Sequence, residues 1–409
     1  MDVKDMIKIT SLGGSGEDSR NCFLVEFNGG SLLLDCGVRR EIADVSRVYP
    51  GLTRQIAQNL SAVLISHAHE DHTAALPYLY ELGYRGYIYA SPETIGLIPP
   101  YLEKWCYYVQ QKGGSLPFQE KNIAKLSFRT IDELPFPVLT GRDGHIIGGL
   151  WYRLEFGNKS LLYTGDLTYD SLMLEADRLP NADALIIDSA YAGLVLDQDT
   201  QYEKLLRKAE LVTEAGGKLL LPVPANGRGI DMFVYLSRFG LPLYAESSII
   251  QNTAELSKQK CWVKPFELPV SGFTAVDKVN RTSVLEDGSG VYLFGDGMMT
   301  SPVSRQYFDA VKTDPRSAVI ISGHSAKGTL ANQLLDENFR TENGIAVSAE
   351  HLTIKVHNDE EDVLNITEKV RPKTVMLFHA RGERCTGLTG KLTARGITAV
   401  CGVNQTIEF

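Results

Sequence analysis

The feature that most restricts the fold of this chain is a group of four potential metal ligands packed into one short segment. The segment reads Ser66-His67-Ala68-His69-Glu70-Asp71-His72. It follows the apolar run Val63–Ile65, which is typical of a β-strand, and precedes Thr73–Leu76, which is typical of a helix start. The pattern therefore predicts that a loop between a strand and a helix carries all four ligands.

The spacing within this segment suits two metal ions. On a loop, His67 and His69 can face one ion while Asp71 and His72 face another, whereas on a helix residues two apart point to different faces. Burying four such side chains without partners would be costly, which disfavours a purely structural role. Neutral imidazole and carboxylate suit zinc or manganese, so we expect two divalent ions, with zinc preferred over manganese.

Three further residues would complete two sets of metal ligands. Two of them are histidines, of which the chain has only eight. His145 lies in a Gly-His turn after an apolar stretch, Asp166 follows the run Leu161–Thr164, and His379 follows Val375–Phe378. Each residue alone is structural as often as functional. Because strands deliver their last side chains to a rim of a sheet, the three together close sets that are otherwise incomplete.

Asp35 ends the apolar run Leu32–Leu34. We expect its carboxylate to hydrogen-bond a ligand histidine rather than a metal, because metal-bound imidazoles are commonly oriented by such a partner. An aspartate that caps the turn before Gly37 fits the spacing nearly as well.

Composition is that of an ordinary soluble protein, with 409 residues of which 44% are hydrophobic and 22% charged. The length predicts two or three domains. No apolar run approaches the ~18 residues of a membrane span, and Met1–Asp5 lacks the features of a secretory signal. We therefore expect a cytoplasmic protein without a membrane partner, for which a homodimer remains open.

Charge and cysteine content add two expectations. A net charge of −9 argues mildly against nucleic acid binding, but metal-binding carboxylates inflate the acidic count and a groove can be locally positive. No CxxC pair occurs, so we expect neither a thiolate zinc site nor disulfides, but buried thiols in a reducing compartment. The six cysteines are Cys22, Cys36, Cys106, Cys261, Cys385 and Cys401.

The order of predicted elements divides the chain into three parts. Short strands come first, helices alternate with strands in the middle as in a parallel α/β domain, and strand-helix-strand-helix-strand returns from about His351. We expect junctions at Gln198–Gln201 and Thr341–Gly344, and hence parts 1–197, 198–344 and 345–409. The predicted strands are Ile7–Leu12, Cys22–Phe27, Ser31–Asp35, Ala62–Ser66, Tyr87–Ala90, Val138–Thr140, Tyr152–Phe156, Ser160–Thr164, Lys218–Leu221, Val291–Phe294 and Ala318–Ser322. The predicted helices of the middle part are Tyr202–Ala215, Gly229–Phe239 and Ser248–Lys258.

These motifs resemble the metallo-β-lactamase superfamily, whose fold is a four-layer αββα sandwich with a binuclear site. The resemblance implies an α/β protein in which metal one is bound by three histidines, metal two by an aspartate and two histidines, and an aspartate bridges both. The matching residues are His67, His69 and His145 for metal one, Asp71, His72 and His379 for metal two, and Asp166 as the bridge.

Within the superfamily the chain resembles the β-CASP family, which includes the RNA 3′-end-processing endonuclease subunit and, more distantly, RNase J. More than two hundred residues separate Asp166 from His379, which leaves room for an inserted α/β domain. Asp188 in Leu185–Tyr191 and His357 in Val356–Asp359 stand at the family's additional motifs. Asp188 replaces the glutamate of the eukaryotic endonuclease, and His357 follows Lys-Val rather than small residues.

Two segments of the insert resemble the SGxxxxGTL segment and the glycine-arginine turn of the endonuclease branch, and both could bind substrate phosphate. One is Ser322–Leu330, whose small residues have backbone N–H groups that suit an anion, and the other is the turn Pro224–Arg228. A plain strand-to-helix turn and a solvated arginine are the simpler explanations. His324 fits RNA contact and structure equally, and His351 reads as structural. The phosphate-binding candidates are Ser322, Gly323, Ser325, Gly328, Thr329 and Arg228.

The resemblance implies cleavage of RNA phosphodiester bonds by water that two metal ions activate. Asp71 and Asp166 hold the ions, His357 protonates the leaving 3′-oxygen, and Asp188 orients His357 and favours its charged form. A surface-loop histidine is the simpler interpretation of His357. The aromatic stretch Tyr101–Tyr108 could stack bases, but a buried helix face is the commoner explanation.

Three competing functions remain. A small-molecule hydrolase acting on a thioester or lactone needs neither the insert nor the Asp188–His357 pair, and a non-catalytic scaffold does not need a full ligand set. A DNA nuclease would differ only in contacts to the 2′-hydroxyl. The sequence leaves open whether RNA would be cut internally or from a 5′ end.

Overall fold

The computed structural model describes residues 6–40, 47–269 and 271–409, which form two compact units. The first, called the sandwich unit, comprises residues up to Tyr169 together with Glu175–Val195 and His357–Phe409. The second, called the inserted unit, comprises Asp170–Leu174 and Leu196–Val356. In the described residues no helix is both long and apolar enough to cross a membrane.

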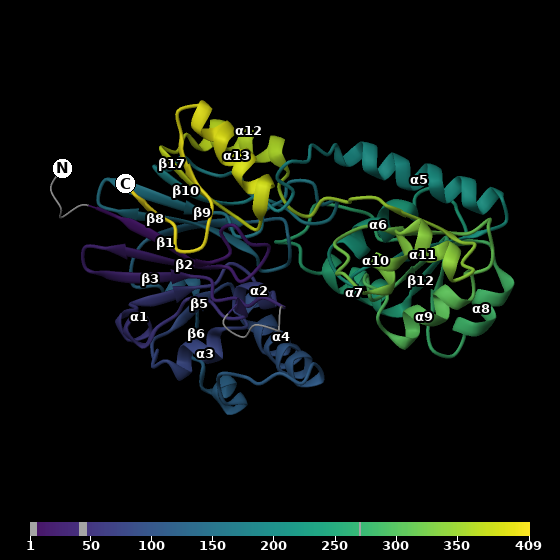
Figure 1. Ribbon diagram of the computed structural model, residues 1–409, viewed down its shortest axis with the longest axis horizontal. Coiled ribbons are helices and arrows are strands. Elements are labelled where there is room, and N and C mark those ends of the chain that lie inside the picture. Colours follow the sequence, from purple (N-terminus) through teal and green to yellow (C-terminus); the bar gives the residue numbers. More distant parts are fainter. Residues whose placement is uncertain (1–5, 41–46, 270) are drawn as a thin grey trace. The chain divides into compact units, whose positions relative to one another are not determined.

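The sandwich unit contains two sheets covered by helices on their outer faces (Figure 1). The seven-stranded sheet has the order β19-β1-β2-β3-β4-β5-β6 and the six-stranded sheet β18-β17-β10-β9-β8-β7. Helices α1, α3 and α4 lie on one side, and α12 and α13 lie on the other. The strands are β1 Lys8–Gly13, β2 Cys22–Phe27, β3 Gly30–Leu34, β4 Ala62–Leu64, β5 Ile88–Ala90, β6 Phe128–Thr130, β7 Val138–Arg142, β8 Leu150–Phe156, β9 Lys159–Tyr163, β10 Ala184–Asp188, β17 Thr374–Phe378, β18 Thr398–Val400 and β19 Thr406–Glu408. The helices are α1 Arg54–Asn59, α2 Glu70–Thr73, α3 Leu76–Glu81, α4 Pro92–Gln111, α12 Glu360–Val370 and α13 Gly382–Ala394, with short 3₁₀ helices η3 Glu120–Lys125 and η4 Ile131–Glu133.

Large side chains fill the space between the two sheets. Phe23 of β2 packs against Tyr163 of β9 and Phe378 of β17, with ring centroids 5.6 and 5.4 Å apart. Tyr152 of β8 is fully buried and donates a hydrogen bond to the carbonyl of Ile65, 2.6 Å away. Because protein interiors are close-packed, these contacts hold the ends of β4, β9 and β17 in fixed relation.

The inserted unit is built on one six-stranded parallel sheet with the order β13-β12-β14-β11-β15-β16. Parallel strands need crossover connections, and helices supply most of them. Its strands are β11 Lys218–Pro222, β12 Leu243–Glu246, β13 Phe273–Val276, β14 Gly290–Phe294, β15 Ala318–Ile321 and β16 Ser348–His351. Its helices are α5 Gln198–Glu214, α6 Arg228–Leu236, α7 Ser247–Ser257, α8 Arg281–Asp287, α9 Pro302–Asp309, α10 Leu330–Leu334 and α11 Glu337–Glu342.

Several helix starts follow directly from local sequence. The side chain of Ser91 accepts a hydrogen bond from the Thr94 N–H at the start of α4, where Pro92 occupies the first helical position. Asp359 and Asp362 form a reciprocal capping box at the start of α12. The second cap starts α12 immediately after the segment that carries His357.

The structure corrects the predicted junctions. Gln198–Gln201 forms the first turn of α5 rather than a linker, because Asp197 caps that helix through the Thr200 N–H. The strand predicted near His351 pairs with β15 and so belongs to the inserted sheet rather than to the last part. The strands β6, β12 and β13, of three or four residues, were not predicted.

The cysteine prediction was wrong in two respects. Cys385 of α13 and Cys401 after β18 form a disulfide, with Cα atoms 6.2 Å apart. Cys261 is exposed, whereas Cys22, Cys36 and Cys106 are the buried free thiols that were expected. The pairing could not be seen in sequence because β18 brings together two residues that no motif spacing connects.

A buried carboxylate holds the short segment Asp170–Leu174 against the rest of the inserted unit. Asp231 of α6 accepts hydrogen bonds from the Ser171 hydroxyl, 3.0 Å away, and from the Leu172 N–H, 3.1 Å away. Lys264 supports the same segment through the Ser171 carbonyl, 2.5 Å away. Burial raises the pKa of Asp231 to about 6, and the hydrogen bonds only partly oppose that rise.

This raised pKa predicts a pH effect on stability. The pKa of Asp231 in the folded protein exceeds its ordinary value of 3.8. Protonation of Asp231 therefore adds to the free energy of unfolding, fully below pH 3.8, and this contribution is lost as pH rises through about 6. Unfolding free energy measured by denaturant at pH 5 and 7.5 should fall by about 1–2 kcal/mol more in the wild type than in Asp231→Asn. Asp309→Asn, an exposed carboxylate, serves as the control. Parallel pH profiles for wild type and Asp231→Asn would contradict the assignment.

Candidate metal centre

The four-ligand segment leaves β4 and enters helix earlier than predicted. Helix α2 already begins at Glu70, and His69 stands at its N-cap. His67 therefore lies on an extended segment, whereas Asp71 and His72 lie on a helical turn. The split backbone conformation is what lets the two halves of the segment point to different places.

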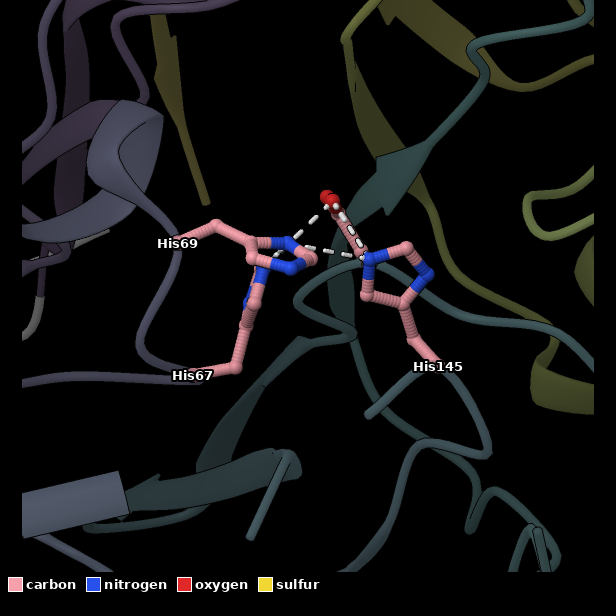
Figure 2. A group of neighbouring side chains, drawn as sticks. His67, His69 and His145 are labelled. Atoms are coloured by element: carbon pink, nitrogen blue, oxygen red, sulfur yellow. Dashed lines mark hydrogen bonds and ion pairs between the residues drawn. The ribbon is translucent and has the colours of Figure 1, made fainter. Parts of the chain in front are cut away.

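The first set of ligands comes from three separate segments. His67 Nε2 lies 3.0 Å from His69 Nδ1, and His145 Nε2 lies 3.3 Å from the same His69 atom. Asp166 Oδ2 lies 3.6 Å from both His67 Nε2 and His145 Nε2. Figure 2 shows the rings of His67, His69 and His145 turned toward one another. We call these four residues the metal-one cluster.

The second set shares Asp166 with the first. His379 Nε2 lies 3.1 Å from Asp71 Oδ2 and 3.6 Å from Asp166 Oδ2. His72 Nε2 lies 3.7 Å from Asp71 Oδ2 and 3.2 Å from Asp166 Oδ1. We call Asp71, His72 and His379 the metal-two cluster. All seven residues that the sequence nominated as metal ligands thus lie in two adjoining groups.

The donor atoms fit divalent ions. In a tetrahedral zinc site with ligand distances of about 2.0–2.1 Å, neighbouring ligand atoms lie roughly 3.3–3.4 Å apart. The separations above, 3.0 to 3.7 Å, bracket that value. Asp166 Oδ1 is also buried without a hydrogen-bond donor, an arrangement that a bound cation would satisfy. Geometry and donor chemistry therefore agree on two cation sites.

An outer layer of hydrogen bonds orients the ligands. His72 Nδ1 lies 2.6 Å from Asp35 Oδ2, so its Nε2 faces the metal-two cluster. Ser66 donates to the same carboxylate through its N–H, at 2.7 Å, and its hydroxyl, at 2.6 Å. Tyr163 donates a further hydrogen bond to Asp35. The structure places Asp35 beside a ligand histidine, as the sequence suggested, and in a left-handed backbone conformation with φ +58°.

Two residues of the outer layer were missed by sequence reasoning. Asp143 is fully buried, and its Oδ1 accepts a hydrogen bond from the His145 N–H at 2.8 Å. Its carboxylate packs directly on Gly149, where any side chain would collide with it. Asn21 Nδ2 lies 2.7 Å from His72 Nε2. The short Asp-Gly-His spacing was a signal for Asp143, but nothing local to Asn21 points to the centre.

Charges in the centre are strongly coupled. Burial lowers the pKa of His69 to about 4, with His72 acting in the same direction. Burial also lowers the pKa of His379, but Asp166 and Asp71 outweigh it and raise that pKa to about 9. Burial disfavours the charged form of Asp166, yet His72 and His379 hold its pKa well below the usual value. Asp166 is therefore a carboxylate able to serve both clusters.

A third group joins the centre from the two sides of the insert. His357 Nδ1 lies 2.9 Å from Asp188 Oδ2 and 3.8 Å from Asp166 Oδ2. Asp188 is fully buried at the end of β10, and its carboxylate accepts hydrogen bonds from the N–H groups of Leu167 and Ala190. The ring of His357 lies against His145 and His379, with centroids 4.7 and 4.9 Å away. The simpler interpretation of His357 as a surface-loop residue does not fit this position.

The phosphate-binding candidates lie in the inserted unit. Arg228, the first residue of α6, donates to the Ile354 carbonyl at 3.3 Å, and its guanidinium packs on Gly323, where a side chain would collide with it. Thr329 caps α10, whereas His324 is exposed. The structure thus brings Arg228 to the start of the Ser322–Leu330 segment. His351 is exposed and bonds the Gly323 carbonyl, 3.0 Å away.

Comparison with known sequences identifies the family. Residues 15–222, more than half of the chain, match the metallo-beta-lactamase superfamily, and residues 233–334 match the Beta-Casp domain. The chain belongs to the metallo-β-lactamase superfamily. This membership confirms the predicted fold class with its β-CASP insert, and it implies that the two clusters bind divalent metal ions.

Several relatives align with almost the whole of this superfamily member. Transcription termination factor FttA of Methanothermobacter thermautotrophicus is 28% identical over 93% of this chain and 67% of its own length. Integrator complex subunit 11 of Danio rerio is 26% identical over 94% and 71%. Cleavage and polyadenylation specificity factor 73 of Drosophila melanogaster is 25% identical over 92% and 60%. A solved structure of a protein of unknown function from Enterococcus faecalis shares the fold, with a TM-score of 0.59, 15% identity and coverage of 99% and 100%.

Because each cluster has ligands of its own besides the shared Asp166, one ion can be lost without the other. His145→Ala removes a ligand of metal one only, and His379→Ala removes a ligand of metal two only. Each variant, after dialysis, should fall from about two bound ions per chain to about one, because three-ligand sites hold zinc less tightly. Elemental analysis measures the ratio, with the exposed His351→Ala as control. Two retained ions in both variants would refute the ligand assignment.

Proposed function

We propose that this β-CASP protein is a zinc-dependent ribonuclease that hydrolyses phosphodiester bonds in RNA. Family membership and the relatives named for transcription termination and for cleavage and polyadenylation support a metal-dependent hydrolase of RNA over the alternatives. Zinc is preferred because histidine supplies five of the seven ligands. The observation that carries the proposal is the Asp188–His357 pair beside Asp166.

This pair provides what phosphodiester cleavage needs beyond the metals. Divalent ions supply Lewis-acid charge and a nucleophilic water when bound. The hydrogen bond between His357 Nδ1 and Asp188 fixes the imidazole ring beside Asp166. A proton of this imidazole goes to the leaving 3′-oxygen, and the bond between this oxygen and phosphorus breaks as water adds. Asp71 and Asp166 remain ionised and hold the positive charge in place.

The competing functions lack such support. Hydrolysis of a thioester or lactone does not require a second acid pair built from both flanks of an inserted domain. A scaffold without activity does not require two complete ligand sets. A DNA nuclease shares all of this chemistry and differs in its substrate contacts, so nucleic acid type is decided by experiment.

The deciding experiment uses one single-stranded RNA sequence in linear and circular forms. Metal-loaded protein should cut RNA, and Asp71→Ala should not, because it loses a ligand of metal two. Cutting of the circle establishes internal cleavage, and cutting of the linear form alone establishes dependence on an end. If both RNAs stay intact with two ions bound, the ribonuclease proposal fails.

Replacement of the proposed acid predicts a loss of turnover without a loss of metal. His357→Ala should lower kcat by about 10²–10⁴, the usual range for a general acid, and leave two ions bound. Asp188→Asn should produce a smaller drop, because the ring keeps a hydrogen-bonding partner. Single-turnover cleavage with parallel elemental analysis measures both. An unchanged kcat in His357→Ala would remove His357 from the mechanism.

A further inference from the structure

One face of helix α4 in the sandwich unit carries side chains that the reaction described so far does not use. Tyr101, Lys104 and Tyr108 stand at positions i, i+3 and i+7, which share a face of a helix. Trp105 and Val109 of the same helix are buried in the core. Tyr101 and Tyr108 are partly buried and pack against that core, whereas Lys104 is exposed.

This face borders the metal-one cluster. The ring of Tyr101 lies 5.5 Å from the ring of His69 at an interplanar angle of 74°, an edge-to-face contact. Helix α4 also packs on α2, which carries Asp71 and His72 (Figure 1). A residue at this place contacts a metal ligand without being one. It is therefore within reach of a substrate whose scissile group lies at the ions.

A cation lies against each of the two half-buried tyrosine rings of this face. Lys104 Nζ lies 5.1 Å from the centre of the Tyr101 ring, and the Arg40 guanidinium lies 5.2 Å from the centre of the Tyr108 ring. Arg40 also pairs with Glu70, so Lys104 is the cation whose charge is better available to a ligand. Lys104 thus places a positive charge beside the ring that contacts the metal ligand His69.

We propose that Tyr101 and Lys104 bind the RNA strand next to the scissile phosphate, with Lys104 contacting a neighbouring phosphate and the Tyr101 hydroxyl donating to a substrate oxygen. The inference rests on the proposed ribonuclease function and deepens it. Alternating aromatic and cationic groups are the usual surface for single-stranded nucleic acid.

The lysine is tested by the salt dependence of binding. Metal-loaded His357→Ala protein, which binds without rapid cleavage, is titrated into a fluorescent single-stranded RNA at several potassium chloride concentrations. Adding Lys104→Gln should lower the slope of log Kd against log salt by roughly 0.7, and should weaken binding about fivefold at ~0.1 M salt. Lys121→Gln, an exposed lysine on η3 of the same unit, is the matched control and should change neither quantity.

The tyrosine is tested by removing only its hydroxyl. Tyr101→Phe keeps the ring against His69, so metal content should stay at the wild-type value. The kcat/KM for RNA should fall about two- to tenfold, because the variant loses one neutral hydrogen bond to substrate. A lower metal content with unchanged kcat/KM per bound ion would instead show a positioning role for the ring and overturn the substrate contact.

The outcomes separate this inference from the ribonuclease proposal. If wild-type protein neither binds nor cuts RNA, the ribonuclease proposal fails and the inference with it. If wild type binds and cuts RNA while Lys104→Gln matches Lys121→Gln and Tyr101→Phe matches wild type, only the inference fails. Loss in the Lys104 and Tyr101 variants, with the control unchanged, supports it.

Discussion

The structure depends most on the buried carboxylate of Asp166. Its two oxygens lie 3.2 to 3.6 Å from nitrogens of four histidines that come from three different parts of the chain. Burial of a charged group is expensive unless opposite charge compensates it. Here the histidines hold the pKa of Asp166 low, and one oxygen still has no donor. Bound cations would compensate this buried negative charge at the middle of the centre.

Such a centre requires rigid support, because ligands from distant segments must meet within a few tenths of an ångström. The aromatic contacts of Phe23, Tyr163 and Phe378 fix the two sheets against each other directly beneath the ligands. Asp35 then links the sheets through hydrogen bonds from Ser66 and Tyr163 while it orients His72. Stability and function therefore share the same residues at this rim.

The inserted unit does not interrupt the metal clusters, and the two residues that flank it in sequence form a further pair beside them. Asp188 precedes the insert and His357 follows it, and the two meet at 2.9 Å inside the sandwich unit. The insertion thus separates Asp188 from His357 in sequence but not in space. Within the inserted unit, the Arg228 guanidinium packs on Gly323.

The sequence alone determined the family, and it predicted the seven metal ligands, Asp35 and the Asp188–His357 pair, because each stands in a short motif or at the end of an apolar run. It could not determine how these residues share partners. Only tertiary structure showed that α2 starts at Glu70, that Asp143 and Asn21 support the ligands, and that Cys385 bonds Cys401. It also brought the ring of Tyr101 against His69. The physical reason is that motifs record local spacing, whereas contacts between distant segments depend on how the two sheets pack.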